Sequence, residues 1–145
     1  MEDQIEVVRR SYLCAKNGDL HGFAADFAED ICWVEMKGSP YAGIYRGAGE
    51  ILAHVFEPMN RSWTPFACEP QEFYAAGNTV LVVGRYFGTN HATGKSFDAR
   101  MVHLWRLEAG KITSFEQFTD TRRIFESLKP CSERESAAAL RNNKH

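Results

Sequence analysis

The chain has 145 residues, of which 44% are hydrophobic and 25% charged, as in a typical single globular domain with its own core. The 17 Lys and Arg residues face 19 Asp and Glu residues, which makes the formal net charge −2. This balance argues against general nucleic-acid binding, which needs a basic surplus or a clustered basic stripe. The longest aliphatic run, Val80–Val83, is too short to span a bilayer, and the acidic first residues do not resemble a secretory signal. We therefore predict a cytoplasmic protein that binds neither nucleic acid nor membranes.

The residues that most often hold metals or cofactors show no recognisable pattern. The four cysteines, at positions 14, 32, 68 and 131, are widely spaced without a C-x-x-C pair, which predicts reduced thiols. No His-Glu-x-x-His motif or Cys/His ligand set is present, and the glycines of residues 43–49 match no phosphate-binding loop. We therefore expect no metal and no cofactor.

The N-terminal region is predicted to be a helical hairpin. Asp3 followed by Glu6 resembles a capping box, and apolar residues then recur at helical spacing. Asn17-Gly18 predicts the end of this first helix. Asp19 is expected to cap a second helix that extends through Phe27.

Strand and loop patterns follow the hairpin. Alternation over residues 31–36 predicts a strand, and the glycines and proline of residues 38–49 predict a loop. A short third helix is expected over residues 51–56, stopped at Pro58.

The second half of the chain has strand patterns with short connections. The predicted strands span residues 69–75, 79–89, 96–107 and 112–119. Connections this short imply an antiparallel meander, and Gly84 within its strand allows a bulge or bend. A last helix is predicted over residues 120–128.

Helices followed by a curved sheet predict an α+β fold in which three N-terminal helices cover one face. We expect one domain over residues 1–130 and a polar tail over residues 131–145, with a frayed helix near residues 137–140. A bent sheet closed by helices leaves a cone, and such concavities commonly bind ligands. The 18 aromatic residues supply candidate walls for it.

Several local motifs, in their order and spacing, resemble one known group. They are residues 17–20 (NGDL), 45–47 (YRG), 110–112 (GKI) and 118–121 (FTDT). The chain resembles, over about residues 4–128, the SnoaL-like branch of the NTF2-like superfamily, which also contains ketosteroid isomerase, scytalone dehydratase and limonene epoxide hydrolase. The resemblance implies a small homodimer with a cone-shaped pocket. It does not imply one reaction, because these proteins share the fold more than the chemistry.

The resemblance also implies which residues of this chain match functional positions of the family. Asp120 matches the proposed base of SnoaL-type polyketide cyclases, whereas Tyr86 stands where those cyclases have a histidine. The base of ketosteroid isomerase falls at Met36, or at Glu35 with a shift of one residue.

Two further positions depart from the isomerase pattern. Its helix-1 tyrosine aligns with Ser11, next to Tyr12, and its protonated aspartate falls near Val102 or His103. Steroid isomerisation of the familiar type is therefore not expected.

Asp120, His103 and Tyr86 are the candidate catalytic residues. Desolvation in an aromatic pocket would raise the pKa of Asp120 and suit it to act as a general base, although the same residue could simply cap the last helix. His103 could exchange protons with a ligand, or be a buried, hydrogen-bonded histidine or part of a dimer interface. Tyr86 could donate a hydrogen bond to a carbonyl or enolate oxygen, or pack within the sheet.

Nine further side chains are candidate ligand contacts, because alternation or helical spacing could turn them into the cone. They are Tyr12, Trp33, Glu35, Phe56, Trp63, Met101, Trp105, Glu116 and Phe118. For both glutamates, a solvated or ion-paired side chain is the alternative. These residues indicate a small apolar or cyclic carbonyl ligand. Two functions stay open: cofactor-independent acid–base chemistry by a cyclase, isomerase or dehydratase, or a non-catalytic binding or dimerisation module.

Overall fold

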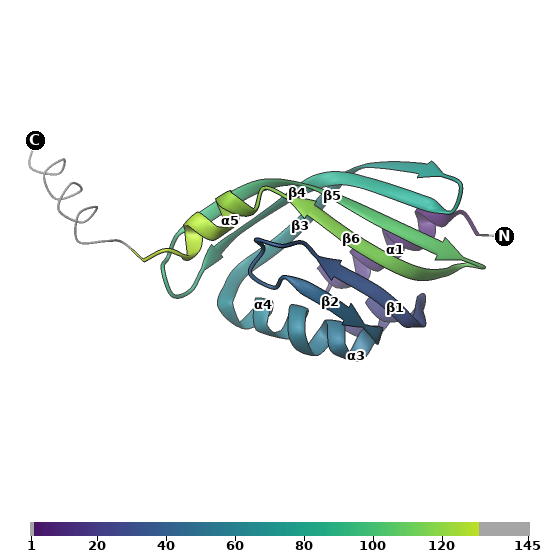
Figure 1. Ribbon diagram of the computed structural model, residues 1–145, viewed down its shortest axis with the longest axis horizontal. Helices are drawn as coiled ribbons and strands as arrows, with labels where there is room; N and C mark the ends of the chain where they lie inside the picture. The colour runs from purple at the N-terminus through teal and green to yellow at the C-terminus, as the bar shows by residue number, and fades with distance from the viewer. Residues whose placement is uncertain (1, 131–145) are drawn as a thin grey trace, which may run out of the picture.

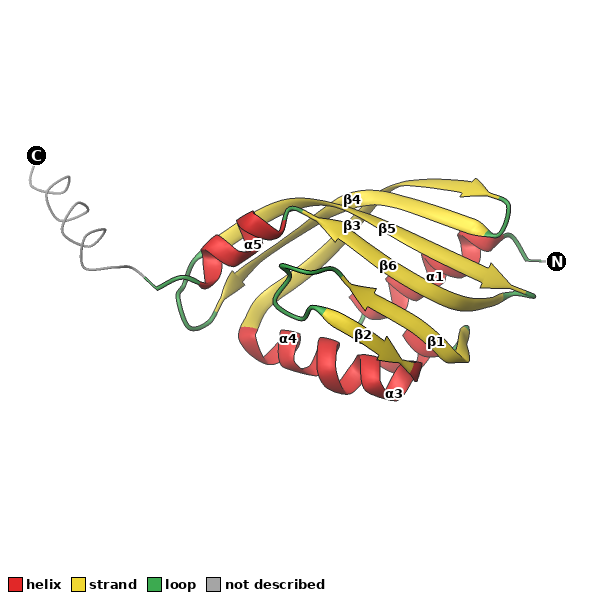
Figure 2. Cartoon of the chain, in the orientation of Figure 1, coloured by secondary structure: helices red, strands yellow, loops and turns green. Residues whose placement is uncertain are grey.

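A curved, unclosed six-stranded sheet forms the framework of the protein, and most of its helices lie on the concave side (Figures 1 and 2). The structure is a computed structural model that describes residues 2–130. The helical elements are α1 (Gln4–Lys16), α2 (Leu20–Ala24), α3 (Gly47–Ile51), the π-helical η1 (Leu52–Phe56), α4 (Glu57–Ser62) and α5 (Thr121–Leu128). The strands are β1 (Phe27–Glu35), β2 (Gly43–Arg46), β3 (Trp63–Ala76), β4 (Thr79–Asn90), β5 (Ser96–Glu108) and β6 (Lys111–Thr119).

The strands run in the order β2-β1-β6-β5-β4-β3. From β3 to β6 each strand pairs antiparallel with the next, so the predicted meander is confirmed. β1 joins the other side of β6 in parallel, and β2 pairs antiparallel with β1 at the edge. The predicted α+β class is therefore also confirmed.

Local capping signals position the first helices. The Asp3 carboxylate accepts a hydrogen bond from the backbone N–H of Ile5 at 3.0 Å, and Asp19 accepts one from Gly22 at 2.9 Å. Both predicted helix starts are confirmed. The second helix is shorter than predicted, because Phe27 is the first residue of β1.

The region from residue 38 to residue 62 differs most from the prediction. The expected loop contains the edge strand β2. The expected short helix continues past Pro58, which lies in the first turn of α4. The elements α3, η1 and α4 follow one another without a break beside β1 and β3 (Figure 1). Pro58 stands directly after the π-helical turn, where the regular α-helical hydrogen bonds are already interrupted.

Two glycines of β4 let β3 approach unusually closely. A Cβ atom on Gly84 would lie 2.2 Å from the carbonyl oxygen of Glu69, and one on Gly88 would lie 2.1 Å from that of Pro65. The register shifts opposite Gly84, between Pro70 and Glu72, as the predicted irregularity requires.

The core lies between the concave face of the sheet and the helices. Strand β5 shows the pattern clearly, since its odd-numbered residues from Phe97 to Leu107 are buried. Cys14, Cys32 and Cys68 are free thiols, as predicted. Within residues 2–130, none of the helices is long and apolar enough to cross a membrane. The helix expected near residues 137–140 and the fourth cysteine lie outside the described residues.

Candidate functional site

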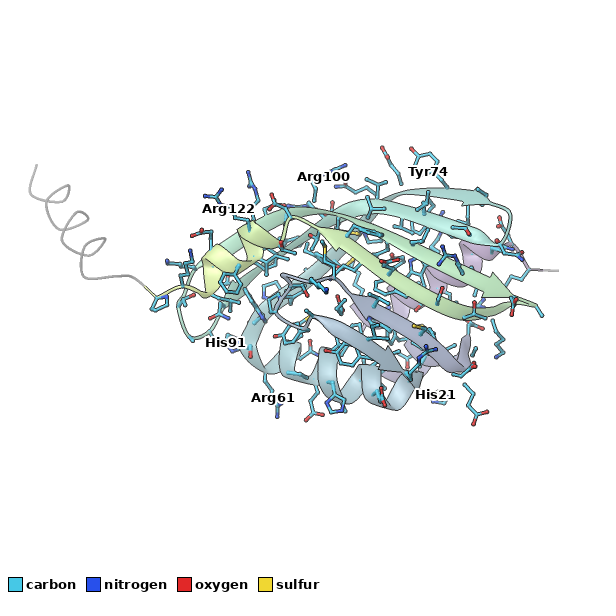
Figure 3. The ribbon with its side chains drawn as sticks, viewed as in Figure 1. His21, Arg61, Tyr74, His91, Arg100 and Arg122 are labelled. Carbon is cyan, nitrogen blue, oxygen red and sulfur yellow. The ribbon has the colours of Figure 1, made fainter. Side chains whose placement is uncertain are left out.

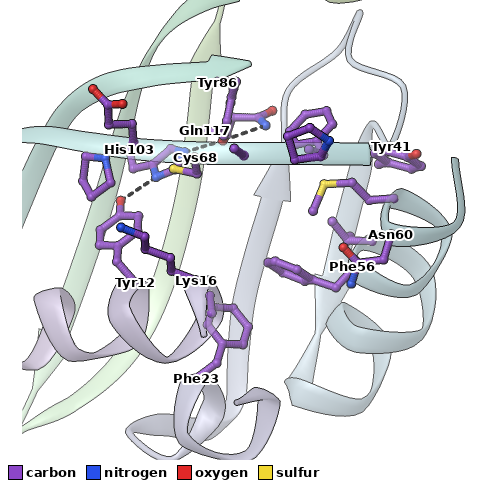
Figure 4. A pocket seen from close by; sticks show the side chains of 18 of the residues that line it. Tyr12, Lys16, Phe23, Tyr41, Phe56, Asn60, Cys68, Tyr86, His103 and Gln117 are labelled. Carbon is purple, nitrogen blue, oxygen red and sulfur yellow. Dashed lines mark hydrogen bonds between the residues drawn. The ribbon is translucent and has the colours of Figure 1, made fainter. Parts of the chain in front are cut away.

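A cavity of about 850 Å³ opens between the sheet and the helices, within the range of about 300–1,000 Å³ usual for small-molecule sites. Its surface is mainly apolar. The aromatic lining residues are Tyr12, Phe23, Trp33, Tyr41, Phe56, Trp63, Phe66, Phe73, Tyr86, Phe87, His103, Trp105 and Phe115. Figure 4 shows how side chains from α1, α2, the segment η1–α4 and the sheet converge on this space.

Glu35, the last residue of β1, is the buried carboxyl of the cavity, with 7% of its surface exposed. Its Oε1 accepts a hydrogen bond from Trp33 Nε1 at 3.2 Å, whereas Oε2 is buried without a partner. Burial raises the pKa of Glu35 to about 7, and the hydrogen bond from Trp33 offsets only part of this effect. A carboxyl with this pKa can both accept and release a proton near neutral pH.

A chain of hydrogen bonds joins two tyrosines through His103. The Tyr12 hydroxyl lies 2.5 Å from His103 Nδ1 and accepts a hydrogen bond from Trp105 Nε1 at 2.9 Å. On the other side of the imidazole, His103 Nε2 bonds with the Tyr86 hydroxyl, which also accepts from Gln117 Nε2 at 3.2 Å. Figure 4 shows this chain along one wall of the cavity.

Burial sets the charge state of these groups. His103 is 3% exposed, and desolvation lowers its pKa to about 3, so the imidazole is neutral at physiological pH. Desolvation also raises the pKa values of Tyr12 and Tyr86 well above the ordinary value. The chain therefore consists of neutral donors and acceptors.

The structure brings most of the predicted site residues to the cavity. Those that line it are Tyr12, Trp33, Glu35, Phe56, Trp63, Tyr86, His103 and Trp105. Their roles toward a ligand stay predictions.

Asp120 does not lie at this cavity, which corrects the prediction that it is the base there. Its carboxylate caps α5 by accepting a hydrogen bond from Arg123 N at 3.3 Å, and it pairs with Arg123 Nε at 3.4 Å. The side chain is 45% exposed. The alternative interpretation, that Asp120 caps the last helix, describes its position.

Three predicted ligand contacts also lie elsewhere. Phe118 is 44% exposed on the outer face of β6, and Glu116 shares that face. Met101 is buried in the core, where its terminal methyl approaches Gly84, and it is not among the cavity residues. On β6 the inward residues are Phe115 and Gln117, one position away from those predicted.

Gln117 and Cys68 are buried or half-buried polar residues of the cavity that were not predicted from the sequence. Gln117 accepts from Met36 N at 3.3 Å and donates to Tyr86, so it orients the hydroxyl. The signal for it was present, because alternation places it with Phe115. Cys68 lines the cavity from β3, and burial raises the pKa of its thiol to about 12, so it is a protonated thiol rather than a nucleophile.

Within residues 2–130, no group of three or more His, Cys, Asp and Glu side chains is arranged to hold a metal ion.

Comparison with known proteins identifies the family. The family model of the SnoaL-like domain matches residues 8–115. The chain belongs to the SnoaL-like family. Among curated proteins, none matches this SnoaL-like chain.

Solved structures of NTF2-like proteins are similar to this SnoaL-like protein. One from Burkholderia thailandensis E264 is 42% identical, with a TM-score of 0.87 over 90% of this chain and 100% of that one. A second, from Burkholderia pseudomallei K96243 and described as of unknown function, is 30% identical, with a TM-score of 0.81 over 89% and 99% of the two chains. TerC, co-crystallised with polyporic acid, is 27% identical, with a TM-score of 0.76 over 86% and 97%.

Proposed function

We propose that this SnoaL-like protein binds a small cyclic carbonyl compound in its cavity and moves a proton on it without a cofactor, with Glu35 as the base. The observation that carries this proposal is the buried Glu35 carboxyl, whose Oε2 has no partner and whose pKa is raised to about 7. A base with this pKa suits removal of a proton from carbon next to a carbonyl group, because it is ionised often enough to act and basic enough to react.

The surroundings of Glu35 support the same chemistry. The aromatic walls suit an apolar ring, and the hydroxyls of Tyr12 and Tyr86 are neutral donors on the same cavity. Such donors stabilise the oxyanion that forms when a carbonyl compound enolises. A relative of this chain, TerC, was co-crystallised with a small organic molecule.

Hydrogen–deuterium exchange at the α-carbon of 2-indanone tests the proposal without knowledge of the natural substrate. In D₂O, the protein is expected to accelerate exchange above buffer, as followed by proton NMR. Glu35→Gln keeps the shape of the carboxyl and its bond to Trp33 but cannot take the proton, so the acceleration is expected to fall about a hundredfold. Glu29→Gln, which changes an exposed glutamate of the same strand, is the matched control and is expected to retain it.

A non-catalytic binding module predicts a different result. In that case 2-indanone binds equally to the wild type and to Glu35→Gln, and exchange in both matches buffer alone. If the wild type and Glu35→Gln accelerate exchange equally, and both faster than buffer alone, then Glu35 is not the base.

We also propose that two copies pair through the outer face of the sheet. Val83, Val102 and Phe118 lie in register on three adjacent strands, with Leu81 and Leu104 beside them. Leu81 is 37% exposed and Phe118 is 44% exposed, and an apolar area of this kind marks an interaction surface.

Several features of this face fit a second copy. The helices α1, α3 and α4 lie on the opposite, concave side (Figure 2), and Tyr74 and Arg100 project outward from the uncovered side (Figure 3). Arg100, Arg106 and Glu116 surround the apolar residues. Under two-fold symmetry the same patch of each copy would face that of the other, so its apolar centre would be buried against itself.

Phe118→Glu is expected to convert a dimer into a monomer, because it would bury one carboxylate from each copy in the interface. Sedimentation equilibrium measures the change. Phe125→Glu, which alters an exposed phenylalanine of α5 outside the patch, is expected to stay dimeric. A wild type that is monomeric at high concentration would contradict the assignment.

A further inference from the structure

The two tyrosines and the imidazole of His103 carry one more hydrogen than the two hydrogen bonds that join them can use. Four bonds link the chain: Trp105 to Tyr12, Tyr12 to His103, His103 to Tyr86, and Gln117 to Tyr86. The indole nitrogen of Trp105 and the amide nitrogen of Gln117 can only donate and supply the hydrogens of the two outer bonds. The neutral imidazole donates through one nitrogen and accepts through the other, and each phenol carries one hydrogen. Three hydrogens, one on the imidazole and one on each phenol, therefore serve the two bonds to His103, and the remaining hydrogen belongs to a tyrosine. The second amide hydrogen of Gln117 is separate from this count.

The tautomer of His103 decides which tyrosine keeps the spare hydrogen. When Nε2 carries the proton, it donates to Tyr86, Tyr12 donates to Nδ1, and the Tyr86 hydrogen is left over. When Nδ1 carries the proton, it donates to Tyr12, Tyr86 donates to Nε2, and the Tyr12 hydrogen is left over. Each hydroxyl already accepts one bond from a group that can only donate, Trp105 for Tyr12 and Gln117 for Tyr86, so no other arrangement keeps all four bonds.

The spare hydrogen is available to a ligand in the cavity. Both tyrosines line the cavity, and the hydrogen bonds of the described residues give neither hydroxyl a further acceptor. A buried donor without a partner is costly, so a ligand that brings an acceptor oxygen to this wall is favoured over a purely apolar one of the same shape.

We propose that the Tyr12–His103–Tyr86 chain presents one switchable hydrogen-bond donor to the carbonyl oxygen of the ligand, and that the His103 tautomer selects which tyrosine donates. This rests on the proposed binding of a carbonyl compound in the cavity and adds how the oxygen is recognised. His103 is then a positioning residue that stays neutral, in agreement with its burial and its lowered pKa.

The ligand preference can be measured with two probes of nearly the same shape, 2-acetylnaphthalene and 2-ethylnaphthalene. The wild type is expected to bind the ketone about five- to tenfold more tightly, the ratio typical of one hydrogen bond. Tyr12→Phe and Tyr86→Phe are each expected to retain a preference, because the tautomer can shift to free the remaining hydroxyl. A preference abolished by one substitution and untouched by the other would show a fixed donor and overturn the switch.

The tautomer itself is the readout that a purely structural role would not move. With the ketone bound, ¹⁵N NMR of labelled histidine is expected to show His103 protonated at Nε2 in Tyr12→Phe and at Nδ1 in Tyr86→Phe. A His103→Gln variant identifies the signal by its loss. The same tautomer in both variants would contradict the proposal.

A third measurement uses only the wild type, in case a substitution prevents folding. The carbonyl stretch of bound 2-acetylnaphthalene is expected at lower frequency than in hexane, because a phenol donates to it. If neither naphthalene binds, the proposed function fails for this ligand class. If both naphthalenes bind equally and the carbonyl stretch is unshifted, the proposed function stands. The proposal that a tyrosine donates to the carbonyl oxygen is then wrong.

Discussion

Glu35→Gln is expected to raise the free energy of unfolding by about 3 kcal/mol above pH 8. Burial shifts the pKa of Glu35 from 4.5 to about 7, and each pKa unit corresponds to about 1.36 kcal/mol. Since the folded-state pKa is raised, the native state favours the protonated carboxyl. That stability is fully present below pH 4.5 and is lost as pH rises through about 7. Glutamine mimics the neutral form at every pH.

Urea unfolding followed by tryptophan fluorescence between pH 4 and pH 9 measures this difference. His103 acts in the opposite sense, because its lowered pKa removes stability as pH falls from about 6.5 toward 3. This contribution is common to both proteins and cancels in the comparison. Glu29→Gln, which also removes one carboxylate of β1, is expected to lack the gain above pH 8. A difference that does not change with pH would mean that Glu35 is hydrated in solution.

Gly88→Ala is expected to destabilise the protein by about 3 kcal/mol and to lower its melting temperature by roughly 10 °C. The added Cβ would lie 2.1 Å from the carbonyl oxygen of Pro65 and 3.2 Å from the Cα of Phe66. These are backbone atoms of β3, so no side chain can rotate away, and the two strands must separate. Pro65 and Phe66 also line the cavity, so ligand binding is expected to weaken with stability.

Thermal unfolding by circular dichroism measures the effect, with Gly49→Ala as the matched control. Gly49 lies in α3, and nothing stands within 4 Å of its would-be Cβ. Alanine there is expected to be neutral or to stabilise by up to about 1 kcal/mol, because it favours the helix. Equal melting temperatures for the Gly88 variant and the wild type would show that the backbone of β3 moves away from residue 88 without a cost in stability.

Structural features that depend on only a few neighbouring residues were predicted well from the sequence. Asp3, Asp19 and Asp120 all cap helices, because a carboxylate two or three residues before a free N–H needs no tertiary contact to bond to it. The short edge strand β2 was missed, since its four residues are bounded by glycines and alternate only weakly in burial. Pro58 was wrongly predicted to end the helix, because a π-helical turn, which the sequence does not reveal, precedes it and already interrupts the regular hydrogen bonds.

The candidate site was only partly predictable. Tyr12, Glu35 and His103 were named because residue type and spacing marked them, and all three line the cavity. Asp120 was given the role of base because its position in the chain matched the family, yet its own capping geometry holds it away from the cavity. The hydrogen-bonded chain from Trp105 to Gln117 joins β5, α1, β4 and β6, so no local pattern could reveal it.

The sequence by itself determined the helix starts, the antiparallel meander and the two alternating residue sets of each strand. Only the tertiary structure decided which set faces inward, because both faces of β6 carry an aromatic beside a polar residue: Phe115 with Gln117, and Phe118 with Glu116. A strand whose side chains alternate with period two can bury either set. The helices that pack against one face of the sheet decide which set is buried. The same packing excludes water from Glu35 and so makes an ordinary glutamate into a candidate base.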